Sequence, residues 1–249
     1  MKKNVWSKDG KRTVDMYPNN LKEAIFKYNK KYNKKYIWPE ERLFSPSRVL
    51  DQTSDKSFLE AWRKKVGEEE ANRIVQYSIA VGKSMHSYLE TSIKKMSHIS
   101  HTKLPPSTET SDKKIEKLSM SLGNIILEKG LKNKLQEVWG VESRLHFGNY
   151  YRGIADLIGI YEDEPCIIDF KQKRKPQMEH YDSIKNYFTQ TAAYGMAHNH
   201  MCKTNIKKGV ILIATHDYKF QKFIIQGDAW RKHCLNFIKR LKTCMKEDQ

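Results

Sequence analysis

Apolar residues recur along most of the chain at the spacings of helices and strands. Positions three or four apart indicate amphipathic helices, whereas alternating or continuous β-branched runs indicate strands. The pattern predicts helices over residues 21–36, 57–66, 68–96, 115–129, 181–198 and 228–246, and strands over 137–147, 151–161, 166–171, 208–215 and 220–226. From residue 115 on, the order is helix, three strands, helix, two strands, helix. This order predicts an α/β fold with a mixed central sheet flanked by helices.

We expect residues 1–249 to form a single domain, since neither an internal repeat nor a second core is visible. Residues 1–20 are polar and basic and are predicted to be a tail, followed by a helical N-terminal part over residues 21–96. Residues 97–114 are rich in Ser, Thr and Pro, which predicts a flexible loop or a flap. Residues 115–249 carry the predicted core.

Composition points to a polyanionic partner. The 249 residues are 39% hydrophobic and include 5 Trp, 13 Tyr and 9 Phe, which is enough for a sizeable core. Lysine and arginine number 46 against 29 acidic residues, a formal net charge of +17. A domain this basic attracts nucleic acid at long range, although lysine-rich solvated faces are an alternative explanation. Lysines also alternate with aromatic residues in the range 21–36, which fits either an amphipathic helix or a groove for a nucleic acid strand.

The 4 cysteines show no Cys-x-x-Cys pair and no ladder-like spacing. They are Cys166, Cys202, Cys234 and Cys244. This spacing argues against a structural zinc site and a disulfide scaffold, so we expect reduced thiols in an intracellular protein. The chain contains no apolar run of about 20 residues, and its N-terminus lacks the apolar core of a signal peptide. We therefore expect neither a membrane span nor secretion.

One predicted hairpin concentrates charged residues on apolar strands. If Tyr161 and Cys166 are its last paired residues, the intervening four residues form an acidic turn that ends in proline, and Asp156 lies opposite Lys171. Side chains alternate between the faces of a strand, so Asp156, Asp169 and Lys171 are predicted to share one face. Such charges are costly to bury without partners, and a divalent cation is the economical partner.

Oxygen ligands from Asp156 and Asp169 suit a hard cation such as Mg²⁺, which also binds substrate phosphates. Lys171 could then orient or activate the attacking water, or stabilise the charged transition state. Glu142 on the preceding strand could add a ligand or position a water. His86 lies one helical turn after Gly82, which leaves space beside the imidazole; simple packing of this histidine is the alternative.

These residues resemble a known nuclease pattern. Gly153-x-x-Asp156 followed by Asp169-Phe-Lys171 is similar to the core motif of the PD-(D/E)XK nuclease superfamily. Gln190-Thr-Ala-Ala-Tyr194 resembles the Gln-x-x-x-Tyr helix motif of its RecB-like branch, and Gly82-x-x-x-His86-x-x-Leu89-Glu90 resembles that branch's upstream helix motif. Four motifs in the right order, each on its expected element, make the resemblance specific over residues 80–200.

The N-terminal part of the chain extends this resemblance to the nucleases. Residues 45–53 and 61–71 are similar to the corresponding region of the mitochondrial genome maintenance exonucleases and their bacterial and phage relatives. The resemblance implies a restriction-endonuclease-like core and a single-domain, metal-dependent exonuclease that prefers single-stranded DNA ends.

The resemblance also implies roles for individual residues. Metal ligands would be Asp156, Asp169, the carbonyl of Phe170 and His86. Lys171 would be the catalytic lysine, Glu142 would join the acidic cluster, and Gln190 and Tyr194 would support the site and contact substrate phosphate. Ser45, Ser47 and Arg48 are separate candidates for holding a phosphate, although a plain helix N-cap explains the serines equally well.

The sequence departs from the nuclease motifs at one position and lacks the motifs of two cofactors. The superfamily is named for a proline that precedes its first aspartate. Ala155 occupies that position here, a replacement that the RecB-like branch tolerates. The cysteine spacing does not match the iron–sulphur subgroup, and no Gly-x-x-x-x-Gly-Lys-[Ser/Thr] motif occurs, so we expect neither an iron–sulphur cluster nor ATP.

We therefore expect a monomeric, Mg²⁺- or Mn²⁺-dependent exonuclease that acts on single-stranded DNA and does not bind membranes. A structure-specific endonuclease of the same superfamily and a catalytically inactive nucleic-acid-binding module are the alternatives. The lysine-rich composition favours an AT-rich source such as a phage, and hence the cytoplasm of an infected host; a eukaryotic origin would favour mitochondria, although no transit peptide is evident.

Overall fold

The computed structural model describes residues 26–38, 43–99, 108, 110–178 and 181–247. Within these residues, the strands are β1 (Lys27–Tyr28), β2 (Leu135–Phe147), β3 (Tyr151–Tyr161), β4 (Glu164–Lys173), β5 (Lys208–Thr215) and β6 (Phe220–Gln226). The α-helices are α1 (Pro46–Gln52), α2 (Ser57–Val66), α3 (Glu68–Met96), α4 (Lys113–Ile125), α5 (Asp182–Cys202) and α6 (Gly227–Glu247). A 3₁₀ helix, η2 (Lys30–Lys35), and a π turn, η3 (Ile126–Leu131), complete the described elements.

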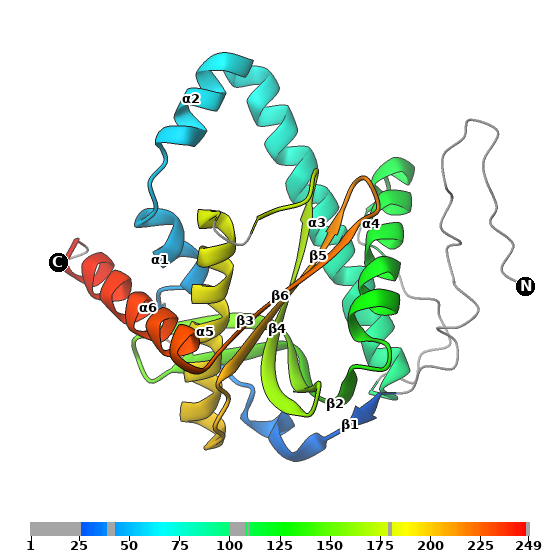
Figure 1. Ribbon diagram of the computed structural model, residues 1–249, viewed down its shortest axis with the longest axis vertical. Helices are drawn as coiled ribbons and strands as arrows, with labels where there is room; N and C mark the ends of the chain where they lie inside the picture. The colour runs from blue at the N-terminus through cyan, green and yellow to red at the C-terminus, as the bar shows by residue number, and fades with distance from the viewer. Residues whose placement is uncertain (1–25, 39–42, 100–107, 109, 179–180, 248–249) are drawn as a thin grey trace, which may run out of the picture.

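The strands form one mixed sheet in the order β1-β2-β3-β4-β5-β6. Strands β2, β3 and β4 form an antiparallel meander, and α5 is the crossover that brings β5 parallel to β4. Helices α3 and α4 cover one face, while α5 and α6 cover the other (Figure 1). This is the predicted α/β architecture, and it is consistent with a restriction-endonuclease-like core.

Each face of the sheet carries its own hydrophobic core. Phe170, Leu157 and Leu212 pack toward α3 and α4, where Met85 and Leu122 meet them. On the opposite face, Ile158, Ile167 and Ile211 pack against α5 and α6. Burial on both faces explains why β4 and β5 read as continuous apolar runs rather than as alternating ones. None of the helices formed by the described residues combines the length and apolar character needed to cross a lipid bilayer.

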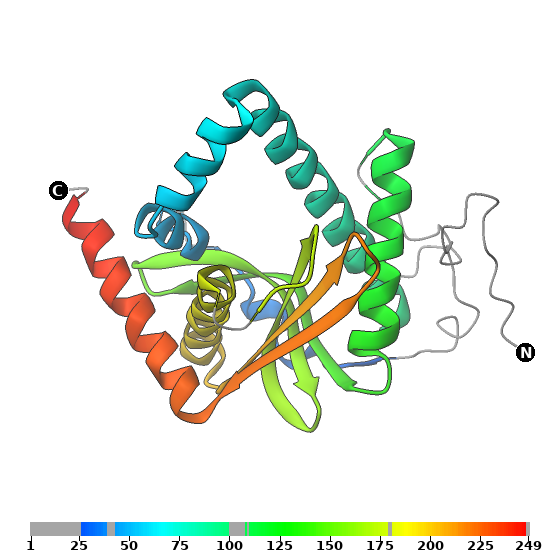
Figure 2. The ribbon, with the colours of Figure 1, turned by 45° about the horizontal axis from the view of Figure 1, so that its top comes forward.

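The N-terminal half of α3 and all of α2 stand away from the sheet (Figures 1 and 2). Helix α2 has no buried residue, and Phe58 on it is 84% exposed. Gly67, with φ +91°, forms the sharp joint between the two helices. Apart from Ala71, the buried residues of helix α3 begin at Val81, where it reaches the sheet.

The β3–β4 hairpin differs from its predicted register by two residues. Tyr161 pairs with Glu164, so the loop is only Glu162 and Asp163, both with positive φ, as in a type I′ turn. Continuing this register places Asp156 opposite Asp169 rather than Lys171. Because side chains alternate with period two, a shift of two leaves the parity of the predicted face unchanged.

The predicted helix over 21–36 is wrong for the residues that the structure describes there. Lys27 and Tyr28 instead pair parallel to Glu137 and Val138 at the edge of β2, and a 3₁₀ helix capped by Asn29 follows. Tertiary pairing with an exposed sheet edge overrides the local helical spacing. Residues 1–20 lie outside the described residues, as do residues 100–107 and 109 of the predicted loop over 97–114.

Two helix ends also need correction. The helix predicted over residues 115–129 is α4 only as far as Ile125, and the chain continues as the π-helical turn η3 to Leu131. A side chain at Gly130 would meet Leu212 and Phe220 at 2.9 and 3.2 Å, so the glycine lets this turn pack closely against β5 and β6. Helix α5 extends past the predicted end at His198 to Cys202.

Candidate active site

The candidate site lies where strands β3 and β4 part. Their ladder ends at the pair Leu157–Ile168, and Phe170 lies two residues beyond this pair on β4. The Phe170 N–H donates to Asp156 Oδ2 at 2.7 Å, and the Phe170 carbonyl lies 3.0 Å from His86 Nε2. The main chain of Phe170 therefore links an acid on the sheet to a histidine on α3.

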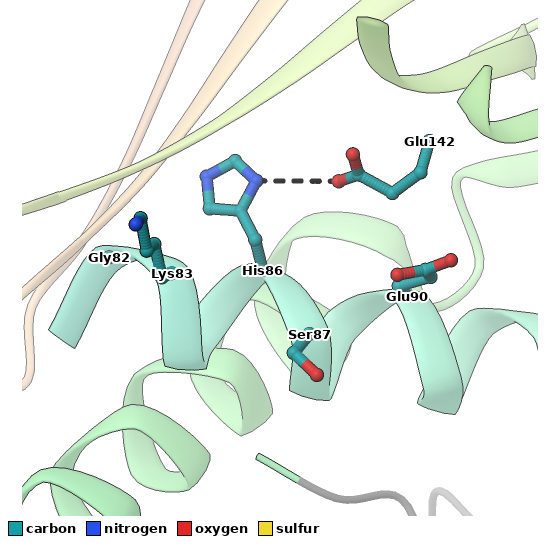
Figure 3. A pocket seen from close by; sticks show the side chains of 6 residues that line it. All are labelled: Gly82, Lys83, His86, Ser87, Glu90 and Glu142. Atoms are coloured by element: carbon teal, nitrogen blue, oxygen red, sulfur yellow. Dashed lines mark ion pairs between the residues drawn. The ribbon is translucent and has the colours of Figure 1, made fainter. Parts of the chain in front are cut away.

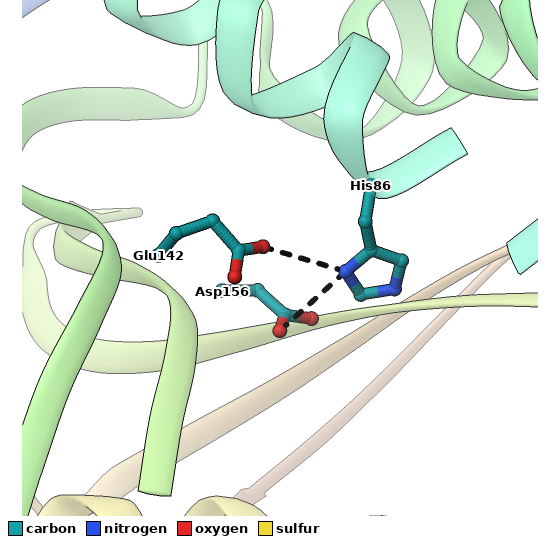
Figure 4. A group of neighbouring side chains, drawn as sticks. All are labelled: His86, Glu142 and Asp156. Carbon is teal, nitrogen blue, oxygen red and sulfur yellow. Dashed lines mark ion pairs between the residues drawn. The ribbon is translucent and has the colours of Figure 1, made fainter. Parts of the chain in front are cut away.

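His86, Glu142 and Asp156 form a compact group (Figure 4). His86 Nδ1 lies 3.5 Å from Glu142 Oε1 and 3.6 Å from Asp156 Oδ1. One nitrogen or oxygen from each residue lies within 4.8 Å of the others. The structure thus brings together three of the predicted site residues from three separate elements: α3, β2 and β3.

Glu142 has an unusual backbone. It lies between the ladder pairs Val141–Leu157 and Ser143–Ala155, which puts it across from Asp156, yet its φ is +46°. Non-glycine residues pay a conformational cost in this left-handed region, and such strain persists only where the surroundings enforce it. The ladder continues in register on both sides of Glu142, so the unusual conformation is confined to the residue that faces Asp156.

The group is electrostatically coupled. Burial alone would lower the pKa of the His86 imidazole, but the carboxylates of Asp156 and Glu142 outweigh it and raise this pKa to about 9. Burial raises the pKa of Asp156, and the charges of His86 and Lys171 offset part of that rise. At neutral pH the histidine is thus protonated and neutralises part of the acidic cluster, and coordination of a metal ion through its ring would displace that proton.

Asp169 and Lys171 form a second, buried pair. Lys171 Nζ lies 2.7 Å from Asp169 Oδ1 and 2.6 Å from Oδ2, with the two side chains 19% and 2% exposed. Burial raises the pKa of Asp169 to about 6. Burial opposes the charged form of Lys171, but Asp169 and Asp156 raise its pKa above the usual value. Both groups are therefore charged at neutral pH.

Tyr187 on α5 is a neighbour that sequence reasoning did not assign to the site. The Lys171 ammonium lies 4.9 Å from the centre of its ring, and that of Lys173 lies 5.2 Å from it. Tyr187 precedes Gln190 by three residues, so both project from the same side of α5. This spacing is the signal in the sequence that could have identified Tyr187 as a site residue.

Gln190 and Tyr194 lie one turn apart on α5 and are hydrogen-bonded to each other. Gln190 Nε2 donates to the Tyr194 hydroxyl at 3.1 Å and to Ser47 Oγ at 3.3 Å. Burial raises the pKa of Tyr194 to about 12, with contributions from Asp156 and Asp169. Tyr194 is therefore a neutral hydroxyl beside the acidic residues.

Gly153 makes room for this arrangement. A Cβ at Gly153 would lie 2.8 Å from Tyr194 and 3.1 Å from Pro46. The first glycine of the motif thus allows β3, α1 and α5 to meet closely.

The other residues proposed to hold phosphate lie at the start of α1. Ser45 is the N-cap, and its Oγ accepts from the Arg48 N–H at 3.1 Å, as the simpler interpretation predicted. The Arg48 guanidinium lies 5.3 Å from the centre of the Phe44 ring. Among the three, Ser47 is the one hydrogen-bonded to Gln190.

A pocket of about 410 Å³ opens beside the His86 imidazole (Figure 3). Its lining consists of Gly82, Lys83, His86, Ser87, Glu90 and Glu142. A Cβ at Gly82 would meet nothing within 4 Å, so this glycine leaves open space as predicted. Lys83 and Glu90 were not among the predicted site residues, although both lie on the same helix, one turn or less from His86.

The residues of the site fit a hard divalent cation. Two carboxylates and an imidazole converge in the group around His86, and such cations favour carboxylate oxygens. The Phe170 carbonyl and Asp169 lie at its border. Asp169 Oδ2 is buried and, despite the close Lys171 Nζ, accepts no well-aligned hydrogen bond from the described residues. That oxygen retains the capacity to coordinate a cation.

Comparison with known proteins gives one informative match. No family model matches the chain. Over 183 residues, covering 70% of the chain, it is 27% identical to mitochondrial genome maintenance exonuclease 1 of Xenopus tropicalis. That relative is a nuclease by name. The chain spans about half the length of this curated relative, since the match covers 48% of it. The match supports a relationship to nucleases, in agreement with the residues gathered around His86.

Proposed function

We propose that this chain is a Mg²⁺- or Mn²⁺-dependent deoxyribonuclease that hydrolyses phosphodiester bonds at single-stranded DNA ends. The observation that carries the proposal is the convergence of His86, Glu142 and Asp156 beside the buried Asp169–Lys171 pair. The similarity to a genome maintenance exonuclease supports the same reaction class.

Asp156, Glu142 and His86 would hold the cation, with Asp169 and the Phe170 carbonyl as the further ligands implied by the sequence motif. When bound, a divalent cation polarises a phosphate oxygen and lowers the pKa of a water molecule. The residues of the chain then have separate tasks. Asp156 and Glu142 supply negative charge that fixes the cation, and Tyr194 and Gln190 offer polar groups to substrate phosphate.

Lys171 acts through its positive charge. Its pKa is raised rather than lowered, so at neutral pH Nζ carries a proton and is a poor acceptor of another. A fixed ammonium can donate hydrogen bonds to a phosphate oxygen whose negative charge grows in the transition state. Asp169 holds Nζ in place through two contacts, at 2.7 and 2.6 Å. The close pairing with Asp169 favours charge stabilisation by Lys171 over removal of a proton from water.

DNA as the substrate agrees with the charge of the chain, +17, and with the projecting arm formed by α2 and the first half of α3. The arm exposes Phe58 and Tyr77 together with basic residues of the last turn of α2. Aromatic rings and lysines are the groups that hold unpaired strands by stacking and by phosphate contacts. We propose that this arm contacts the strand outside the catalytic centre.

The test is a time course on end-labelled linear single strands with Mg²⁺, beside a circular single strand of the same sequence. We expect progressive shortening of the linear strand, EDTA sensitivity and an intact circle, because an exonuclease needs an end. Cleavage of the circle would instead favour the endonuclease. Strand binding with no cleavage in Mg²⁺ or Mn²⁺ would favour the inactive binding module and overturn the proposed activity.

A further inference from the structure

Trp38 lies against two arginines at the edge of the candidate site. The Arg144 guanidinium is 5.0 Å from the centre of its ring system, and that of Arg152 is 4.7 Å from it. Trp38 is nevertheless 38% exposed. A large aromatic ring held by two cations and still open to solvent is a surface that can accept another flat group.

The arginines come from the same face of the sheet. In the β2–β3 ladder, Arg144 pairs with Ile154 and His146 pairs with Arg152, so the two arginines are diagonal neighbours. Diagonal neighbours on one face lie close enough for long side chains to meet over a common partner. Both arginines therefore reach the Trp38 ring from the sheet, and 38% of Trp38 remains exposed to solvent.

This platform continues directly from the acidic cluster. Arg144 follows Glu142 by two residues on β2, and Ile154, which is 37% exposed, precedes Asp156 by two on β3. Two residues of a strand span about 7 Å. One nucleotide of an extended strand can bridge that distance, so a strand with a phosphate at the acidic cluster can place its next nucleotide near Arg144, which contacts Trp38.

A second pocket lies between Glu142 and Arg144. It measures about 340 Å³, and its lining includes Glu142, Ser143 and Arg144 together with Lys94 on α3. Glu142 lines this pocket and the one beside His86. The two pockets thus meet at Glu142 and extend from His86 to Arg144, the arginine that contacts Trp38. Lys94, which also lines the second pocket, is paired with Glu90.

We propose that Trp38, supported by Arg144 and Arg152, is a base-stacking subsite for a single-stranded nucleic acid bound across the acidic cluster. The inference rests on the proposed nuclease function and extends it by naming where an unpaired base is held. Stacking requires an exposed base face, which a strand offers and a duplex covers. The arginines keep the ring in place and contribute positive charge to the adjacent phosphates.

The experiment measures binding of a fluorescein-labelled oligothymidylate to the full chain in EDTA, which prevents cleavage. A second probe has the same number of phosphates but abasic residues throughout. For Trp38→Ala we expect the Kd for oligothymidylate to rise about 5- to 150-fold, the loss typical of one stacked base. The Kd for the abasic probe should stay within about twofold, since charge alone governs its binding. Trp38→Phe should recover most of the affinity because it keeps a ring.

The matched control is Leu235→Ala, which removes another exposed apolar side chain, 60% exposed, from α6 on the opposite side of the sheet. It should leave both Kd values unchanged. An unchanged Kd for oligothymidylate in Trp38→Ala overturns the subsite, as does an equal loss on both probes. A thermal melt of each variant verifies the fold, and if Trp38→Ala melts early, the comparison of wild type with Trp38→Phe and Trp38→Leu decides instead. Cleavage by the wild-type chain is scored separately, so failure of the proposed nuclease activity is not confused with failure of the stacking site.

Discussion

The imidazole Nε2 of His86 on α3 lies 3.0 Å from the carbonyl oxygen of Phe170 on β4. This contact orients the ring so that Nδ1 faces Glu142 and Asp156, at 3.5 and 3.6 Å. A histidine held at one nitrogen presents the other in a defined direction, as metal-binding histidines commonly do. The contact therefore aligns the helix with the parted strands of the sheet.

His86 is expected to contribute to cation binding. His86→Ala should weaken Mn²⁺ binding by tenfold or more, about the effect of disturbing the ligand environment of a metal site. Isothermal titration of the purified chain with Mn²⁺ measures this. His146→Ala is the matched control, because His146 lies on β2 near Glu142 but faces the Gly148 carbonyl at 3.1 Å, outside the acidic group. Equal affinities for wild type and His86→Ala would contradict the assignment.

Lys171 and Lys173 provide a second matched pair. Both ammonium groups lie against Tyr187, but Lys171 is also paired with Asp169. Lys171→Ala should lower the rate of DNA cleavage about 100-fold or more, as loss of one preorganised donor does. Lys173→Ala should cost less than about tenfold, through weaker phosphate attraction alone. Single-turnover cleavage of a labelled strand compares them, and similar rates in the two variants would remove Lys171 from the mechanism.

The glycines of the two motifs should respond oppositely to an added methyl group. Gly153→Ala would place a Cβ 2.8 Å from Tyr194, and we expect it to cost about 1–3 kcal/mol of unfolding free energy. Gly82→Ala meets nothing within 4 Å and lies inside α3, so it should stabilise the chain by up to about 1 kcal/mol. Urea unfolding of both variants is the measurement. If Gly153→Ala left the free energy of unfolding unchanged, the Tyr194 side chain would have to move aside without cost, contrary to this prediction.

His198 should make the fold sensitive to acid. It is fully buried, with Nε2 3.1 Å from the Tyr36 hydroxyl and Nδ1 2.8 Å from the Thr204 hydroxyl. Burial lowers its pKa from 6.5 to about 4. The unfolded chain therefore takes up this proton at a higher pH than the folded chain, so stability present at neutral pH is lost as the pH falls from above 6.5 toward 4.

From about pH 7 to about pH 5, this one group should remove about 2 kcal/mol of unfolding free energy. The measurement compares urea unfolding of wild type and His198→Gln at both pH values. The variant should be less stable at neutral pH, because it loses its fit beside Tyr36 and Trp139, yet show a smaller decrease on acidification. The lowered pKa values of His216 and His233 remain in both proteins and cancel in the comparison. Parallel pH dependences would show that His198 is not the responsible group.

Local pattern was enough to predict most of the elements. The limits of α2, α3, β5 and β6 coincide with the predicted ones, because apolar periodicity and turn residues act over a few positions. The hairpin was predicted with a register wrong by two residues, since Glu162-Asp163 is a less obvious tight turn than Asn-Gly. A shift of two preserves the alternation of the strand, so this error leaves the parity behind the predicted shared face unchanged.

Other features depended on contacts between distant segments. Residues 26–36 have a helical pattern, but the free edge of β2 recruits them as a strand and a 3₁₀ helix. The positive φ of Glu142 and the pairing of Asp169 with Lys171 likewise arise only when the sheet is assembled. The position of Trp38 beside arginines from two strands also depends on contacts between distant segments.

The sequence by itself determined which residue types are available and on which helix or strand most of them lie, because those choices follow from short-range periodicity. Tertiary structure decided which of them meet: His86 with Glu142 and Asp156, Lys171 with Asp169 and Tyr187. The physical reason is that these contacts bring together segments far apart in the chain. Their geometry is set by packing across both faces of the sheet, which no local pattern encodes.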